Sequence, residues 1–237
     1  MKHLIGLILL VTSLQISAQT NSDLIKHYEA YYKQMKKQSD VNGVIGALTH
    51  LNILSPSQER LDTLGYIYMS EGQYAQALNT IGIEKVANDS DLAIKVKAVS
   101  LKSLGQPKLA ISFFEDMFNR NPNAIIAFEL AELYLQTQNL AAAEKNIVYG
   151  LANSKDDMTK AYYETQTPYE VPLKSAFMHL NALVTYNKDK IANIDAAVDI
   201  LDAALKSAPN FNLIQLTKNE LLRQKQVIQA ANAQSKN

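Results

Sequence analysis

Few side chains in this sequence are spaced for chemistry, and the clearest sets are acidic. Glu129 and Glu132 lie three residues apart, which would place them on one side of a helix, and Glu115 is next to Asp116. Two neighbouring carboxylates are the minimum for acid-base cleavage of a glycosidic bond. The same spacing is common on the solvated faces of helices. We therefore expect these carboxylates to be surface groups of helices and not a catalytic pair.

Other chemical motifs are missing from the sequence. Its four histidines are scattered, without the His-Glu-x-x-His spacing that places two imidazoles on one helical face for zinc. The chain also lacks Gly-x-Ser-x-Gly, Ser-x-x-Lys, Gly-x-Gly-x-x-Gly and the phosphate-binding Gly-x-x-x-x-Gly-Lys. We expect no catalytic residues, no metal site and no cofactor.

Charge and cysteine content exclude further classes of protein. The 237 residues include 23 Lys+Arg, 23 Asp+Glu and no cysteine. Duplex nucleic acid and anionic membranes attract chains with an excess of basic residues, so we expect no nucleic-acid partner. Without cysteine, the chain can form no disulfide, thiol nucleophile or thiolate metal site.

The segment 1–18 has the layout of a secretory signal peptide. Lys2 and His3 precede a short apolar run from Leu4 to Val11, and Ala18 occupies a suitable exit position. The apolar run is shorter than the roughly 20 residues that span a bilayer. We expect cleavage after Ala18 and export to a bacterial periplasm, with full secretion or an uncleaved anchor helix as alternatives.

The rest of the chain repeats with a constant period, because equivalent residue numbers increase by 33 from one unit to the next. Small residues recur at two positions of the repeat, and large residues recur at a third. The small residues are Gly65, Ala98, Ala131, Ala77, Ala110 and Ala143, and the large ones are Tyr68, Leu101 and Tyr134. Two antiparallel helices approach closely only where the side chain at the crossing is small. Each unit is therefore expected to be a pair of packed helices.

The spacing inside a unit supports two helices around a turn. Leu61, Leu64, Gly65 and Tyr68 fall at i, i+3, i+4 and i+7, which is one stripe of a helix. Gly72 follows where this helix should end, because glycine readily adopts the left-handed conformation that closes a helix.

This pattern resembles the tetratricopeptide repeat (TPR), a helix-turn-helix unit with a small residue on each helix. The resemblance implies an all-α, right-handed superhelical solenoid of about four to five antiparallel helix pairs plus a C-terminal capping helix. The period equals that of ankyrin, but the Thr-Pro-Leu-His signal of ankyrin units is absent. Six residues depart from the TPR pattern. Lys97 replaces an apolar residue, Asp89 and Lys155 each replace a proline, and the first aromatic residue of the unit is replaced by Leu61, Ile94 and Ala127.

The expected domain organisation is a signal peptide (1–18) followed by one helical domain (19–237). Clear repeats are expected over 58–90, 91–123 and 124–156, degenerate repeats over 22–57 and 176–210, an inserted loop over 154–175 and a capping helix over 211–230.

The first helices of stacked pairs line the concave groove of such a solenoid. Residues offset by one from the buried stripe should face this groove, and we expect about half of them to be exposed. They are Asp62, Tyr66, Met69, Lys95, Val99, Lys102, Phe128, Glu132 and Leu135. Apolar anchors combined with charges suit an extended peptide or a partner helix.

The inserted loop carries Tyr162, Tyr163 and Tyr169 together with two prolines. These tyrosines could form a contact surface, or the loop could fold back and pack them over neighbouring helices. We expect a non-catalytic adaptor that binds a protein or peptide segment in its groove. The alternatives are a small-ligand-binding protein or enzyme with a site between the solenoid and the loop, and a protein that associates with itself.

Overall fold

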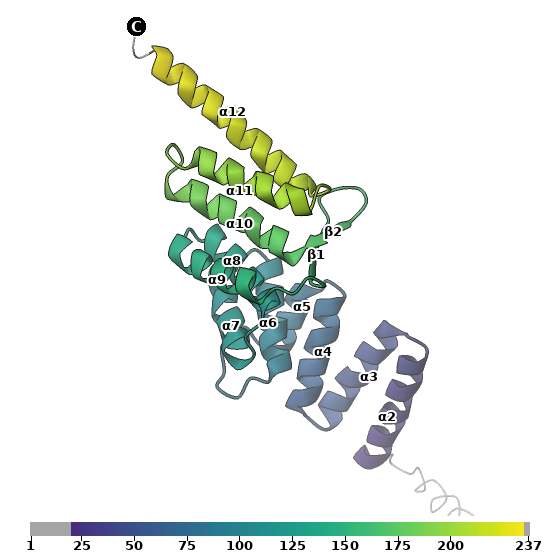
Figure 1. The fold of residues 1–237 in the computed structure, drawn as a ribbon. Helices are drawn as coiled ribbons and strands as arrows, with labels where there is room; N and C mark the ends of the chain where they lie inside the picture. The colour runs from purple at the N-terminus through teal and green to yellow at the C-terminus, as the bar shows by residue number, and fades with distance from the viewer. Residues whose placement is uncertain (1–19, 235–237) are drawn as a thin grey trace, which may run out of the picture. The chain divides into compact units, whose positions relative to one another are not determined.

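The computed structural model describes residues 20–234, so the expected signal peptide lies outside the described residues. The described part is mainly helical (Figure 1). Its elements in chain order are α2 (Asn21–Lys37), α3 (Val41–Leu54), α4 (Gln58–Ser70), α5 (Tyr74–Ile81), α6 (Asp91–Ser103), α7 (Pro107–Arg120), α8 (Ala124–Gln136), α9 (Leu140–Asn153), β1 (Thr159–Tyr162), β2 (Tyr169–Pro172), α10 (Leu173–Lys188), α11 (Ile194–Ser207) and α12 (Asn212–Gln234).

Consecutive helices pack in pairs, which confirms the expected all-α class. The chain divides into two compact units, one ending at Ile83 and the other beginning at Glu84. Unit 1 contains the pairs α2/α3 and α4/α5. Unit 2 contains α6/α7, α8/α9 and α10/α11, followed by α12. The boundary falls inside the expected repeat 58–90, because α5 ends at Ile81 and leaves a connection of irregular backbone.

Left-handed backbone marks the turn inside four successive pairs. Ser39, Gly72, Gly105 and Gln138 have φ angles of 56°, 73°, 69° and 60°, and they recur at the same interval as the small residues. Such a residue closes a helix and redirects the chain. Ser39 shows that the period begins in the first pair, which the sequence alone presented as degenerate.

The starts of the first helices follow the same period. A side-chain oxygen accepts a hydrogen bond from the backbone N–H three residues later, as expected at a helix N-terminus. These hydrogen bonds join Ser57 to Arg60 (3.4 Å), Ser90 to Ala93 (3.0 Å) and Asn123 to Ile126 (3.0 Å).

The small residues predicted at the helix crossings are fully buried. Ala77, Ala110 and Ala143 have no exposed surface, and neither does Ala197 in α11. The repeat phase is therefore confirmed by burial at each of these positions.

The expected inserted loop is an antiparallel β-hairpin. Its register pairs Thr159 with Pro172 and Tyr162 with Tyr169, and α10 begins directly afterwards, at Leu173. Pro172 is tolerated because it ends a strand of a two-stranded sheet, where no further ladder N–H is needed. The loop is thus shorter and more regular than its expected span of 154–175.

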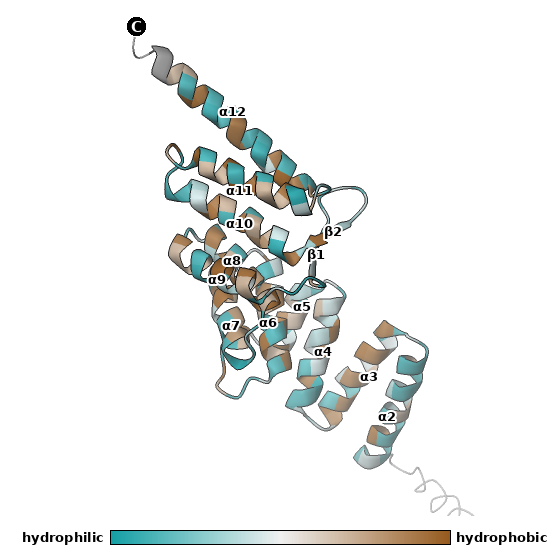
Figure 2. Ribbon diagram, viewed as in Figure 1, coloured by the Kyte–Doolittle hydropathy of each residue, from teal (hydrophilic) through white to brown (hydrophobic). Residues whose placement is uncertain are grey.

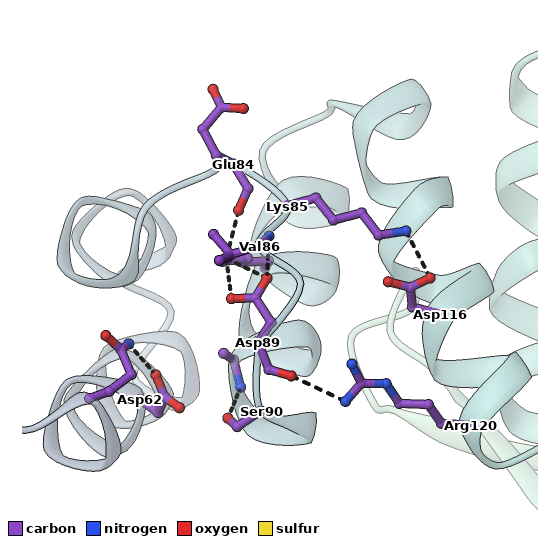
Figure 3. A network of polar contacts seen from close by, with 11 residues as sticks. Asp62, Glu84, Lys85, Val86, Asp89, Ser90, Asp116 and Arg120 are labelled. Carbon is purple, nitrogen blue, oxygen red and sulfur yellow. Dashed lines mark hydrogen bonds and ion pairs between the residues drawn. The ribbon is translucent and has the colours of Figure 1, made fainter.

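Lys97 is a buried cation in α6, with 1% of its surface exposed. Its ammonium donates to the Glu84 carbonyl at 2.7 Å and to both carboxylate oxygens of Asp89 at 2.7 and 2.8 Å. Two further ion pairs fix the same connection to α7: Lys85 with Asp116 at 2.8 Å (Figure 3), and Arg120 with Asp91 at 2.6 Å. Residues 84–91 are therefore anchored to unit 2.

The last helix, α12, packs on unit 2 through one side. Ile214 and Leu221 are buried, and the His179 Nε2 of α10 lies 3.0 Å from the Thr217 hydroxyl. Burial lowers the pKa of His179 from 6.5 to about 4, because the imidazolium would lose its hydration there.

We expect Ala143→Trp to lower the free energy of unfolding by about 3 kcal/mol or more, since overpacking a close helix crossing forces the pair apart. Ala141→Trp, at an exposed position of the same helix, is the matched control and should change it by less than about 0.5 kcal/mol. Urea unfolding followed by circular dichroism measures both. Equal effects would contradict the assigned crossing.

We expect Lys97→Met and Asp89→Ala each to destabilise the chain by about 3 kcal/mol, because each leaves a buried charge without its partner. The double variant should be more stable than the sum of the single losses by about 1 kcal/mol or more. Urea unfolding of the four proteins measures this coupling. Additive losses would show that the two charges do not depend on each other.

The free energy of unfolding should also decrease as the pH is lowered, because His179 is protonated more readily in the unfolded chain than in the folded one. The unfolded chain binds this proton near pH 6.5 and the folded chain only near pH 4, so acid favours unfolding. Between pH 7.5 and pH 5 the loss should be about 2 kcal/mol. His179→Gln should lack this part of the pH dependence in urea unfolding at the two pH values, and an identical pH slope in the variant would contradict it.

Candidate functional site

The expected groove residues of unit 1 divide into two groups. Tyr66 is 37% exposed, whereas Asp62 and Met69 are 4% and 9% exposed. Asp62 accepts a hydrogen bond from the Gln58 side chain at 2.7 Å. The expectation that Asp62 and Met69 face an open groove is therefore wrong. The buried arc of α4 is wider than one stripe, because α4 packs against both α3 and α5.

Tyr66 lines a hollow of about 380 Å³ in unit 1. Tyr32 of α2, Val44 of α3 and Ile67 of α4 also line it, with Lys36 and Glu71 among the charged lining residues. Tyr66 is thus the one predicted groove residue of unit 1 that borders a described hollow.

Unit 2 contains two hollows that share lining residues. They have volumes of about 190 and 350 Å³, and both are lined by Lys95, Met117 and Ile126. The remaining lining residues are Asp91, Ile94, Arg120 and Asn121 in the first hollow, and Val99, Lys102, Ser103, Phe114, Ile125 and Glu129 in the second. Helices α6, α7 and α8 therefore line two adjacent hollows, which together we call the unit 2 groove.

The structure brings three predicted residues together in the unit 2 groove. Lys95, Val99 and Lys102 come from successive turns of α6 and all line the second hollow. Lys95 is exposed, whereas Val99 and Lys102 are half-buried. Their role in binding stays a prediction.

A cluster of alternating charges bounds this groove. Lys102 forms ion pairs with Glu129 and Glu132, and Lys160 of β1 lies 3.0 Å from the other carboxylate oxygen of Glu129. Burial alone would raise the pKa of Glu129, but the charges of Lys102 and Lys160 outweigh it and hold this pKa below its usual value. Burial likewise lowers the pKa of Lys102, and its two carboxylate partners reverse the shift.

Phe128 is buried, contrary to the expectation that it faces the groove. Only 2% of its surface is exposed. Its ring lies 5.2 Å from that of Phe177 of α10, and the Lys160 ammonium lies 4.9 Å from its centroid. The hairpin and α10 cover this part of α8, and Glu132 and Leu135, one and two turns further on, are half-buried.

Both readings of the hairpin tyrosines hold in part. Tyr162 packs with its ring centroid 4.7 Å from that of Phe211, and the Tyr169 hydroxyl accepts a hydrogen bond from the Leu213 N–H at 3.3 Å. Tyr163 remains 76% exposed. Two tyrosines therefore fasten the hairpin to unit 2, and one is available for contact.

Several groove residues were missed by the sequence reading. Met117 and Arg120 belong to α7, a second helix, which was not expected to line the groove. Ile125 lies one helical turn before Phe128 on the same side of α8, so the offset rule selected the correct stripe but the wrong turn. Extending that stripe toward the helix start would have found Ile125.

Within residues 20–234, no three His, Asp or Glu side chains gather in a way that could hold a metal ion. In that range, no helix combines the length and the apolar character that crossing a membrane requires.

Comparison with known proteins places the fold. Neither a protein-family profile nor a curated protein sequence matches the chain. A solved TPR protein from Parabacteroides merdae aligns over 89% of this chain and 78% of its own, with a TM-score of 0.61 and 15% identity. YrrB, described as a TPR protein with an unusual peptide-binding site, aligns over 88% of this chain and 97% of its own, with a TM-score of 0.64 and 13% identity.

The MamA protein aligns over 78% of this chain and 92% of its own, with a TM-score of 0.56 and 16% identity. Such low identities concern the fold and carry no function with them. Together with the paired helices and the constant period of the repeat, these likenesses show that the chain has the tetratricopeptide-repeat fold.

Proposed function

We propose that the chain is a non-catalytic interaction scaffold that binds a protein or peptide segment in the unit 2 groove. The observation that carries this proposal is the pair of adjacent hollows that α6, α7 and α8 line. A groove built from rigid, packed helices needs little ordering on binding, which favours affinity. The peptide-binding site named for YrrB is a precedent within this fold.

The chemistry of the groove suits a segment with apolar anchors. Ile126 and Met117 line both hollows, and 58% of the surface of Ile125 is exposed. When a partner covers exposed apolar side chains inside a concavity, the removal of their surface from water makes binding more favourable. Lys95 and Arg120 supply charges beside these anchors, and charges of this kind set the register of a partner more than its affinity.

The rival reading places an enzyme or ligand site between the solenoid and the insertion. A general acid there would need a carboxyl group with a raised pKa. Glu129 has a lowered pKa instead, and Lys160 of the hairpin is already paired with it. We therefore favour the interaction scaffold.

We further propose that the protein acts in a bacterial cell envelope, with the periplasm as its compartment. The signal-like sequence of residues 1–18 supports this location, and the absence of cysteine is compatible with it.

Ile125→Glu should abolish or strongly weaken capture of the partner, since it places a charge among the apolar side chains of the groove. Val148→Glu is the matched control, because Val148 in α9 is 62% exposed and lines none of the hollows described above. The free energy of unfolding of each variant should lie within about 0.5 kcal/mol of that of the parent. The measurement is a pull-down from an envelope extract of the source cells, with captured proteins identified by mass spectrometry.

A protein retained by the parent and by Val148→Glu, but lost by Ile125→Glu, would support the groove as the binding site. Equal retention by all three proteins would place binding elsewhere. If the folded parent captures no specific protein, that result would contradict the scaffold proposal itself.

A further inference from the structure

Helix α12 is the last element of unit 2 and has no second helix of its own among residues 20–234. It packs on α11 beside the last pair (Figure 1). Figure 2 shows apolar segments alternating with polar ones along it. The apolar residues on its packed side include Ile214 and Leu221, which are buried, whereas Leu216 and Val227 are 54% and 58% exposed. The side of α12 that carries Leu216 and Val227 is its exposed side, and no described residue covers it.

Four residues of the exposed side form one stripe. Leu216, Glu220, Arg223 and Val227 stand at i, i+4, i+7 and i+11, which are neighbouring positions along one face of a helix. The two charged residues occupy the middle of the stripe, and the two apolar residues occupy its ends.

The stripe has an order that matches itself when it is reversed. Its spacings are four, three and four residues, so the midpoint lies between Glu220 and Arg223. In an antiparallel pair with a two-fold axis at this midpoint, Leu216 would face Val227 of the second copy. Glu220 would face Arg223 of the second copy. A two-fold interface requires this kind of self-complementarity.

A parallel pair would have the opposite electrostatics. It would place Glu220 against Glu220 and Arg223 against Arg223, which is unfavourable at a contact. The antiparallel arrangement instead forms a ring of four alternating charges. The existing hydrogen bonds from Arg223 to Glu220, at 2.7 and 2.9 Å within one helix, leave Nη1 of the guanidinium free to donate across the axis.

We propose that the exposed stripe of α12 is an interface through which two copies of this chain associate as an antiparallel, two-fold symmetric pair. The second copy supplies the mate that α12 lacks in the described chain. This association is separate from the unit 2 groove, because none of the four stripe residues lines either hollow.

Charge reversal tests the electrostatic part of the interface on the full chain. Glu220→Arg and Arg223→Glu should each weaken dimerisation by about tenfold or more, because each places like charges opposite one another. The double variant Glu220→Arg/Arg223→Glu should restore it to within about threefold, since opposite charges face each other again. Sedimentation equilibrium over a range of concentrations measures the dissociation constants. Gln229→Glu, on the same helix but away from the stripe, is the control and should leave dimerisation unchanged.

Cysteine cross-linking tests the antiparallel register, and the absence of native cysteine makes the result unambiguous. Mixing Leu216→Cys chains with Val227→Cys chains under mild oxidation should give a covalent dimer. Each variant alone should give far less, because identical positions would lie roughly 16 Å apart across the axis at about 1.5 Å per residue. Circular dichroism confirms that each variant is folded.

A monomer at all concentrations would overturn the proposal. So would a dimer that is insensitive to both charge reversals, or equal cross-linking by the single variants alone, since association would then use another surface or register.

Discussion

The close approach of two helices within each pair is the constraint on which the remainder of the structure depends. At Ala77, Ala110 and Ala143 the side chains have no exposed surface, so a larger side chain would have to be accommodated inside the packed pair. A crossing at a fixed point requires the chain to turn at a fixed distance from it. The left-handed turn residues and the helix-capping residues accordingly recur with the period of these alanines, although their amino acids differ.

Two departures from the repeat pattern explain each other. Lys97 stands where an apolar residue is usual and Asp89 where a proline is usual, and the structure joins them in one buried ion pair. A buried ammonium is tolerated only with charged and hydrogen-bonding partners close by. The segment that leads into α6 is fixed to unit 2 by this pair, whereas a proline would have stiffened its backbone without reaching α6.

The sequence was sufficient for the repeat and insufficient for the surface. Periodicity located the helix pairs because burial at Ala110 or Ala143 leaves a direct mark on residue size. It could not distinguish Ile125 from Phe128, which lie on one side of α8, because the difference comes from the hairpin and α10. The strands of the insertion were not predicted, because Tyr162 and Tyr169 of the paired strands pack near Phe211, which is distant in the sequence.

The insertion changes the available surface without interrupting the core. A Cβ atom added at Gly150 would lie 1.9 Å from the ring of Phe177, so α9 and α10 approach each other closely at this point. The hairpin is therefore laid over a continuous solenoid, and its Lys160 covers Phe128 where the next part of the groove would otherwise open. Free surface remains where no later element packs, beside α6 and α8 at Ile125 and along α12 at Val227. Because no residue of the α12 stripe lines either hollow of the unit 2 groove, partner binding and self-association would use different parts of unit 2 and need not compete.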